Sequence, residues 1–367
     1  MKAAVLYQVG GPLQIEELSI ENPHAGEVMV RVAAGGVCHS DLHVIRGDLR
    51  APLPVVLGHE GAGVVERVGD GVTDFKPGDH VLMLWRASCG HCLHCLGGRP
   101  ALCELGAGIR WSGHLTDGTS RFRRGDTEIR HFAGVSSFGE LTVLPQEGLV
   151  KIEPTVPLDK AAIVGCAVMT GVGAVINTAR VEPGASIVVV GCGGVGLNAI
   201  QGGVLAGAEK VIAVDVLDNK LGFARDFGAT HLINASQVNA IEAVKEVTDG
   251  RGADYAFEVI GIPKAMAEAY QMIRRGGTLV IVGVAPTGAE VSFNASSIML
   301  DEKTIRGSLY GSCIPKRDAP RLLNLYRAGR LKLDELISRE YPLGQINEAF
   351  AALGRGEVAR SIIRFAG

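Results

Sequence analysis

Apolar and polar residues alternate in short runs along the first part of the chain, which predicts β-strands. The alternation is found in residues 27–32, 63–68 and 79–84, and glycine or proline punctuates these runs, as in Lys76-Pro77-Gly78-Asp79. We therefore expect residues 1 to about 155 to be mostly β and to form a small twisted barrel with long loops.

The pattern changes near residue 160, where strand-like and helix-like runs begin to alternate. Strands are predicted at 186–190, 210–215, 231–234, 254–259, 278–283 and 304–310, and helices at 161–179, 194–205, 219–227, 240–248 and 264–274. This rhythm predicts βαβ units and an α/β fold with a six-stranded, doubly wound parallel Rossmann sheet.

A further stretch follows the sixth predicted strand. It contains amphipathic helices near 319–328 and 346–353 and a last strand at 361–365. Because the six-stranded sheet is already complete, we assign this tail to the first domain. The predicted division is a catalytic domain at 1–167, a dinucleotide-binding domain at 168–309 and a return segment of the catalytic domain at 310–367.

Composition places the chain among ordinary globular proteins. Its 367 residues are enough for two cores, 47% of them are apolar and 20% are charged, and the net charge of -3 gives no general attraction to nucleic acid or membranes. We expect no secretory signal at the N-terminus and no membrane span, since we find no uninterrupted apolar stretch of about 18 residues. The eight cysteines are expected to be reduced and largely metal-bound, which favours the cytoplasm.

A glycine-rich motif follows the apolar run Val188-Val189-Val190. Its residues are Gly191, Cys192, Gly193, Gly194, Val195 and Gly196, a G-x-G-x-x-G that opens a predicted helix. Gly191 permits a tight turn, Gly193 lets backbone N–H groups approach a pyrophosphate, and Gly196 lets the helix pack on the strand. The motif alone is weak in a chain with 50 glycines, but its place between strand and helix predicts a dinucleotide site.

The next predicted strand ends at Asp215, about 20 residues further on. A carboxylate there accepts hydrogen bonds from the adenosine ribose and repels a 2′-phosphate, and no arginine directly follows it. Both features favour NAD over NADP. Lys220 lies about one helical turn further and is a second candidate for the ribose.

Four cysteines in one short loop have the spacing C-x2-C-x2-C-x7-C: Cys89, Cys92, Cys95 and Cys103. Four thiolates complete a tetrahedral shell around zinc and leave no vacant position, so this site is expected to stabilise the fold of its lobe. His91 and His94, which lie between the cysteines, are interpreted as surface residues.

Cys38, His59 and Cys166 form a different set of candidate ligands. Two thiolates and one imidazole match a catalytic zinc that keeps a fourth position for water or substrate. Taken alone, Cys166 is also explained as a small core residue and His59 as a loop histidine. Nearby polar residues strengthen the metal hypothesis: Asp41 and Glu60 as supporting carboxylates, with His39, Ser40 and His43 beside the first ligand.

Over essentially its whole length the chain resembles the zinc-dependent alcohol dehydrogenases of the medium-chain dehydrogenase/reductase superfamily. The resemblance rests on residues 36–41 (GVCHSD), 58–63 (GHEGAG), the 89–103 lobe, Gly165-Cys166, the 191–196 loop and Asp215. It implies a GroES-like β-barrel in the catalytic domain and two Zn²⁺ ions per chain. One ion would be structural, and the other would be held by Cys38, His59 and Cys166 with Glu60 behind it.

The resemblance also implies roles in proton transfer and cofactor binding. Ser40 would take the proton of the alcohol and pass it through the nicotinamide ribose to His43 and water. His39 and Arg360 match positions that contact the pyrophosphate, although the family often has arginine at the first. Thr170 and Val195 match the nicotinamide pocket, and Trp85 matches the narrow part of the substrate channel.

The expected reaction is the oxidation of a primary, aromatic or medium-chain alcohol to an aldehyde, or the reverse, with NAD. The alternative is the oxidation of S-(hydroxymethyl)glutathione or a similar thiol adduct, whose carboxylates need cations; Arg50, Arg110 and Arg121 are the candidates. A zinc- and nucleotide-binding protein without catalysis is disfavoured, because an open zinc position has no structural purpose. Residues 117–122 resemble a loop of the dimeric enzymes, so we expect a homodimer, with a homotetramer as the alternative.

Overall fold

A computed structural model of the protein describes residues 1–365 and divides into two compact units. The first unit contains Met1–Cys166, Ile314–Ala328 and the chain from Leu333 onward, and the second contains Ala167–Cys313 and Gly329–Lys332. The predicted boundaries lay at 167 and 309. In the structure the second unit extends to Cys313 and also includes the short segment 329–332.

The first unit contains two β-sheets. One has the strand order β2 (Gln14–Glu17), β1 (Lys2–Leu6), β5 (Val55–Val56), β9 (Thr127–His131), β8 (Phe122–Arg124), β3 (Ser19–Ile20). Apolar side chains of its strands, among them Val5, Val56 and Ile129, are fully buried and form a core on this sheet. These strands carry the long loops expected of the GroES-like barrel.

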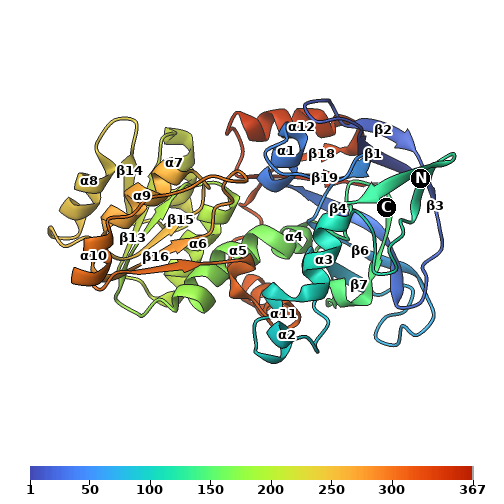
Figure 1. Ribbon diagram of the computed structural model, residues 1–367, viewed down its shortest axis with the longest axis horizontal. Helices are drawn as coiled ribbons and strands as arrows, with labels where there is room; N and C mark the ends of the chain where they lie inside the picture. The colour runs from blue at the N-terminus through green and yellow to red at the C-terminus, as the bar shows by residue number, and fades with distance from the viewer. Residues whose placement is uncertain (366–367) are drawn as a thin grey trace. The chain divides into compact units, whose positions relative to one another are not determined.

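The other sheet of this unit joins the two ends of the chain. Its order is β11 (Leu149–Lys151), β7 (His80–Met83), β6 (Gly61–Val68), β4 (Glu27–Val37), β19 (Arg360–Arg364), β18 (Ile337–Pro342), and β10 (Leu141–Pro145) also pairs with β4. In Figure 1 the red elements α12 (Ile346–Gly354) and β19 lie among the blue strands. The last strand pairs Ser361 with Val37, so it lies next to the turn that leads into Cys38.

The helices of the first unit are short, and several of them follow directly after strands. They are α1 (His39–Arg46), α2 (Leu93–Leu96), α3 (Glu104–Ser112), α4 (Leu158–Ile163), α11 (Pro315–Arg327) and α12, with 3₁₀ turns η1 (Pro100–Leu102), η2 (Gln146–Gly148) and η6 (Leu343–Gln345). Helix α1 begins immediately after Cys38 and ends at Gly47 in the left-handed conformation, a common helix C-terminus.

The second unit is built on a six-stranded parallel sheet. Its order is β14 (His231–Asn234), β13 (Lys210–Asp215), β12 (Ser186–Val190), β15 (Ala253–Glu258), β16 (Ile273–Ile281), β17 (Thr304–Gly307). Numbered along the chain, this is the order 3-2-1-4-5-6 of the Rossmann fold. The predicted doubly wound sheet is therefore confirmed, and its crevice is expected beside β12, where the strand order reverses.

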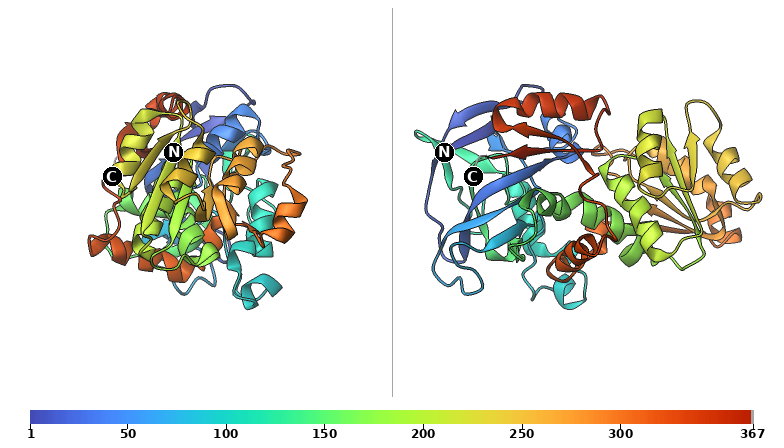
Figure 2. Two further views of the ribbon diagram at one scale, coloured as in Figure 1. Left: turned by 90° about the vertical axis from the view of Figure 1, so that its left-hand side faces the viewer. Right: turned by 180° about the vertical axis from the view of Figure 1, so that it is seen from behind.

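Helices cover both faces of this sheet, as Figure 2 shows. They are α5 (Met169–Gly173), α6 (Gly194–Ala206), α7 (Asp218–Asp226), α8 (Ala240–Val247), α9 (Pro263–Met272) and α10 (Ala295–Leu300), with the turn η5 (Tyr310–Ser312). On one face Val244 and Ala269 of the helices pack on strand residues such as Val188 and Ile212. The central strands β12 and β13 are buried almost throughout, which explains their continuous apolar sequences.

The predicted helix at 161–179 is longer and less regular than expected. It runs from Leu158 to Ala179 and includes two π-helical segments, η3 (Val164–Val168) and η4 (Ala174–Ala179). By length and composition alone this helix could cross a membrane, although glycines interrupt its apolar sequence. However, 83% of its most apolar window is buried inside the protein, as in a core helix.

Candidate metal centres and cofactor loop

The four lobe cysteines come together in the structure. The sulfur atoms of Cys89, Cys92, Cys95 and Cys103 all lie within 4.8 Å of one another. The Cys89 N–H donates to the Cys103 sulfur and the Cys92 N–H donates to the Cys89 sulfur, each at 3.3 Å. A backbone N–H from Glu104, followed by one from Cys95, lowers the pKa of Cys92 to about 6. Such N–H···S contacts favour thiolates, which are the form that binds zinc.

Cys38, His59 and Cys166 also meet, although they come from distant parts of the sequence. Cys38 caps α1, His59 lies between β5 and β6, and Cys166 lies in the π-helical segment η3. Their ligand atoms, with one Glu60 oxygen, lie within 4.8 Å of one another, and all four residues are buried. The Cys166 thiol donates towards the Cys38 sulfur, which lowers the pKa of Cys38 well below its usual value. This is the mixed donor set that the sequence predicted.

Asp41 orients the imidazole of this cluster. Its Oδ2 lies 2.9 Å from His59 Nδ1, and its Oδ1 accepts the Gly58 N–H at 3.0 Å. Within the described residues neither ring nitrogen of His59 has a partner with hydrogen-bond geometry, so the 2.9 Å contact with Asp41 is an ion-pair contact and Nε2 is buried with no partner. This arrangement fits a catalytic zinc site. Two thiols and an imidazole nitrogen without a hydrogen-bond partner would bind the ion, and the carboxylate beside the imidazole would support it.

Glu60 and Arg360 form a buried ion pair beside the same cluster. Burial raises the pKa of Glu60 to about 7, against the effect of the Arg360 guanidinium. A side chain at Gly36 would overlap the Glu60 carboxylate, so glycine is required there. Nothing in the sequence indicates this pairing of Arg360 with Glu60, and the expected contact of Arg360 with the cofactor stays a prediction.

The predicted relay residues lie on α1. Ser40 is half-buried in the first turn, and the His43 ring lies 6.4 Å from the His39 ring between centroids. His43 Nδ1 lies 2.9 Å from Asp48 Oδ2. Asp48 was not among the predicted residues: Gly47 marks the end of the helix, but the sequence does not show that the turn there brings the Asp48 carboxylate back to His43.

Aromatic rings surround the His59 imidazole. Trp85 and Phe132 meet it edge-on, with ring centroids 6.4 Å and 6.0 Å away. Both are buried. Trp85 was expected here from the family resemblance, whereas Phe132 had no signal in the sequence. These rings give the donor set an apolar wall suited to the hydrocarbon part of an alcohol.

The structure changes the interpretation of the three candidate arginines. Arg121 is fully buried and forms ion pairs with Glu27 at 2.7 Å and Asp117 at 2.5 Å. It is therefore not available to bind substrate, and the hypothesis that it lies at a pocket mouth is wrong. Arg50 is exposed. Arg110 is half-buried and stacks on Trp85, with its guanidinium carbon 4.5 Å from the ring centroid.

The glycine loop has the geometry that a pyrophosphate needs. Gly191 adopts φ +102°, which favours glycine, and a side chain at Gly196 would overlap the Gly191 carbonyl. A Cβ built at Gly193 meets nothing within 4 Å. The N-terminus of α6, which begins at Gly194, is thus open at the position where the motif predicts phosphate.

Asp215 lies at the end of β13 beside this loop. Its carboxylate accepts N–H groups from Cys192 at 2.7 Å, Val216 at 2.8 Å and Leu217 at 3.1 Å. It therefore holds the loop, and its contact with a ribose stays a prediction. Lys220 is half-buried in α7, and Thr170 and Val195 are half-buried in α5 and α6. Cys192 is buried, in line with its interpretation as a structural residue.

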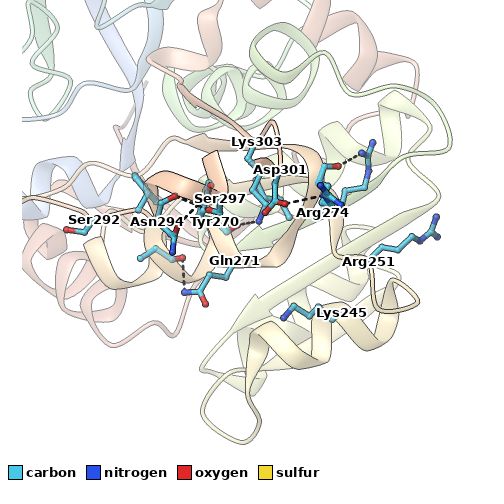
Figure 3. A pocket seen from close by; sticks show the side chains of 14 residues that line it. Lys245, Arg251, Tyr270, Gln271, Arg274, Ser292, Asn294, Ser297, Asp301 and Lys303 are labelled. Atoms are coloured by element: carbon cyan, nitrogen blue, oxygen red, sulfur yellow. Dashed lines mark hydrogen bonds and ion pairs between the residues drawn. The ribbon is translucent and has the colours of Figure 1, made fainter. Parts of the chain in front are cut away.

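A separate cavity of about 430 Å³ lies in the second unit between α8, α9 and α10 (Figure 3). Its lining contains several cations that already have partners. Arg274 pairs with Asp254 at 2.6 Å, Arg275 pairs with Asp301 at 3.2 Å, and Lys303 donates to the Tyr270 carbonyl at 3.3 Å. None of the predicted site residues lines this cavity.

Comparisons with known proteins agree with this site. A family model described as an alcohol dehydrogenase GroES-like domain matches residues 24–154, and one described as a zinc-binding dehydrogenase matches 194–328. The chain is 43% identical over 365 residues to the NDMA-dependent alcohol dehydrogenase of Amycolatopsis methanolica, covering 99% of this chain and 98% of the relative. It is 41% identical over 373 residues to the S-(hydroxymethyl)glutathione dehydrogenase of Paracoccus denitrificans, covering 99% of each.

Among solved structures, benzyl alcohol dehydrogenase from Acinetobacter calcoaceticus matches with a TM-score of 0.95 and 35% sequence identity. The match covers 100% of this chain and 99% of that one. The chain belongs to the zinc-dependent alcohol dehydrogenases of the medium-chain dehydrogenase/reductase superfamily.

Proposed function

We propose that this oxidoreductase converts a primary alcohol to its aldehyde, or the reverse, with NAD as the hydride carrier. The observation that carries the proposal is the buried set of Cys38, His59 and Cys166, with His59 held by Asp41 at 2.9 Å. A bound zinc would act as a Lewis acid that lowers the pKa of the alcohol hydroxyl. The nicotinamide would accept the hydride.

The residues of α1 are proposed to handle the proton. Ser40 would accept it from the substrate hydroxyl, since it lies two residues after the metal-binding Cys38. His43 would release it to water, because its ring is partly exposed. Because the Asp48 carboxylate accepts a hydrogen bond from the Nδ1–H group of His43, the Nε2 atom is left as the basic nitrogen of the ring.

NAD is proposed over NADP on the basis of Asp215. A carboxylate at this strand end accepts ribose hydroxyls and repels a phosphate at the 2′ position. The residues Gly191, Gly193, Gly194 and Gly196 would hold the pyrophosphate, with His39 and Arg360 as further contacts. Val195, Thr170 and Lys220 complete the proposed cofactor set.

We propose two Zn²⁺ ions per chain, the second held by the four lobe cysteines. All eight cysteines lack a disulfide, and six of them lie in the two clusters. Thiolate clusters require a reducing compartment, which supports a cytoplasmic location.

We also propose a homodimer. Strand β17 is the last strand in the order of its sheet, so one of its edges is unpaired among residues 1–365. The preceding helix exposes three apolar residues, Ile298, Met299 and Leu300. An unpaired edge beside an apolar patch is typical of a surface that pairs with a second copy.

The test is a substrate screen with zinc-loaded enzyme and either NAD or NADP. We expect NAD-dependent oxidation of benzyl and medium-chain primary alcohols, and near-complete loss in His59→Ala. The control is His91→Ala, which changes an exposed histidine of the lobe. Absence of any NAD-dependent alcohol oxidation in zinc-loaded protein would contradict the proposal.

A second candidate activity is the oxidation of S-(hydroxymethyl)glutathione. Its support is the name of the Paracoccus relative and the position of Arg110 near the metal-binding cluster. A screen with formaldehyde in the presence and absence of glutathione separates the two activities. Activity that requires glutathione would favour this candidate.

A further inference from the structure

The cavity in the second unit between α8, α9 and α10 gathers positive charge (Figure 3). Among the described residues that line it, one carboxylate, Asp301, accompanies five cationic side chains: Lys245, Arg251, Arg274, Arg275 and Lys303. These cations come from α8, the loop after it, the start of β16 and the turn before β17. The fold, rather than one basic run of the sequence, therefore brings them to a single space.

Lys303 is a cation of this cavity that the protein does not pair with a carboxylate. Its Nζ donates to the Tyr270 carbonyl at 3.3 Å and lies 4.7 Å from the centroid of the Tyr270 ring, but within residues 1–365 it has no ion-pair partner. Burial lowers the pKa of Lys303, the Asp301 charge opposes that effect, and the charge of Lys245 adds to it. Lys245 and Lys303 are therefore close enough to repel each other, and a bound anion would relieve the repulsion.

The other cations of the cavity keep donors for a ligand. Arg274 uses its Nε for Asp254 and one terminal nitrogen for the Arg275 carbonyl, each at 2.6 Å. Lys245 meets Glu242 at 3.4 Å, but 69% of the Glu242 side chain is exposed, so water weakens this ion pair. A guanidinium has five N–H donors and an ammonium has three, so both side chains have donors left.

The size and the walls of the cavity suit a small molecule. Its volume of about 430 Å³ lies within the range of small-molecule sites. The rings of Tyr270 and Phe293, with centroids 5.1 Å apart, give it an apolar side. The Tyr270 and Ser297 hydroxyl oxygens lie 2.7 Å apart, and this hydrogen bond fixes α9 to α10 at the cavity.

We propose that this cavity binds a small polyanion, a compound that carries at least two carboxylate or phosphate groups. A ligand with several anionic groups can pair with more than one of Lys245, Arg274 and Lys303 at once, which favours it over a monoanion. Guanidinium and ammonium groups bind carboxylates and phosphates through the same charge-assisted hydrogen bonds. The proposal is independent of the alcohol oxidation, because none of the residues assigned to zinc, NAD or substrate lines this cavity.

Isothermal titration calorimetry of the zinc-loaded protein tests the proposal with two trianions, tricarballylate and trimetaphosphate. We expect saturable binding of at least one of them, and binding of acetate at least about 10-fold weaker. Lys303→Met keeps the length of the side chain without its charge and should raise Kd about 10- to 100-fold, the loss for one charged hydrogen bond. Lys245→Met, the second variant, should also raise Kd. Lys264→Met is the matched control, because Lys264 is an exposed lysine of α9 that does not line the cavity.

The two trianions distinguish the sources of the negative charge. Binding of trimetaphosphate alone assigns a phosphate-bearing ligand, binding of tricarballylate alone assigns a polycarboxylate, and comparable binding of both shows that the cavity selects charge. Added NaCl should weaken the binding of either trianion, since salt screens the attraction between the ligand and the cations.

The glycine loop is a competing anion site, so each titration is repeated with saturating NAD. We expect the trianions to bind the NAD-loaded protein as tightly as the free protein, and binding that NAD abolishes would belong to the loop and overturn the proposal. The Tm of each variant is measured without ligand, and where Lys303→Met lowers it, the Kd of Lys245→Met decides. Absence of binding by either trianion, Kd values unchanged in both variants, or an equal rise in Lys264→Met would also overturn the proposal.

Discussion

His43 and Ser40 occupy opposite ends of the proposed proton route, and substitution should separate their contributions. We expect His43→Gln to lower alcohol oxidation about 10²-fold at low pH, the lower end for general-base assistance, because water can partly replace a half-exposed base. External imidazole should restore part of the rate. Ser40→Ala should cost more and show no rescue, since a buffer cannot reach the substrate hydroxyl.

Asp48→Asn is the control for the relay. It keeps the His43 ring but removes the charge 2.9 Å from Nδ1, so its pH–rate profile should lie between wild type and His43→Gln. A His43→Gln profile that overlays the wild type, without rescue by imidazole, would assign His43 to the surface and remove it from the relay.

Asp215 combines a structural and a recognition role, and two substitutions distinguish them. Both Asp215→Gly and Asp215→Asn remove the charge and should lower the NAD/NADP ratio of kcat/KM about 10- to 100-fold. Asp215→Gly also leaves the N–H groups of Cys192, Val216 and Leu217 without their acceptor, so its Tm should fall further. A wild type that prefers NADP would contradict the interpretation of this strand end.

The cysteine lobe is an element that depends on its metal. Helix α2 has only four residues and no buried side chain, so it cannot hold its conformation by packing. Cys95→Ser should therefore lower Tm by several degrees and release one zinc per chain, whereas Cys166→Ser should abolish turnover with a smaller change in Tm. The opposite pattern would exchange the two sites.

Strand β9 carries a histidine that should make the first unit sensitive to acid. His131 stacks on Phe122 with ring centroids 4.3 Å apart, and its Nε2 accepts the Arg121 N–H at 3.3 Å. Burial, and next the Arg121 charge, lower the pKa of His131 to about 3. The unfolded chain, with a pKa near 6.5, binds a proton that the native state refuses, so stability is full above pH 6.5 and falls as the pH drops towards 3.

His131→Gln keeps an acceptor for the Arg121 N–H but does not titrate. Between pH 6.5 and pH 5 the wild type should lose about 1.6 kcal/mol of stability more than this variant, because the unfolded histidine is half protonated at pH 6.5 and almost fully protonated at pH 5. Urea unfolding at the two pH values measures the difference. Equal losses in the two proteins would show that His131 is not responsible.

Local patterns predicted the elements of the Rossmann sheet closely, and non-local contacts account for what was missed. Strands 186–190, 210–215 and 231–234 were predicted to the residue, because each is an apolar run bounded by turns. The π-helical segment around Cys166 lies within a continuous apolar sequence that gives no sign of it. The burial of Arg121 depends on Glu27, 94 residues away, and no local pattern indicates such a partner.

The metal-binding set was predictable for a different reason. Cysteine and histidine positions limit which residues can bind zinc, whereas the fold decides whether they meet. The pairing of Ser361 with Val37 brings the C-terminal strand beside the first ligand and places Arg360 against Glu60. Only the resemblance to a family had indicated a role for Arg360, and its ion pair became visible only in three dimensions.

The assembly of the whole molecule gives the last prediction. A dimer formed through β17 would place the apolar residues Met299 and Leu300, which are 70% and 62% exposed, near a second copy. Charged residues there cannot be buried without partners, so the double substitution Met299→Glu, Leu300→Glu should yield monomers in light scattering at micromolar concentration. Leu93→Glu, Leu96→Glu is the control, because these leucines are similarly exposed at 77% and 76% but belong to the cysteine lobe. If the lobe variant dissociates and the α10 variant does not, the interface lies at the lobe. If the wild type has the mass of a tetramer and either variant reduces it to dimers, both surfaces take part in the assembly.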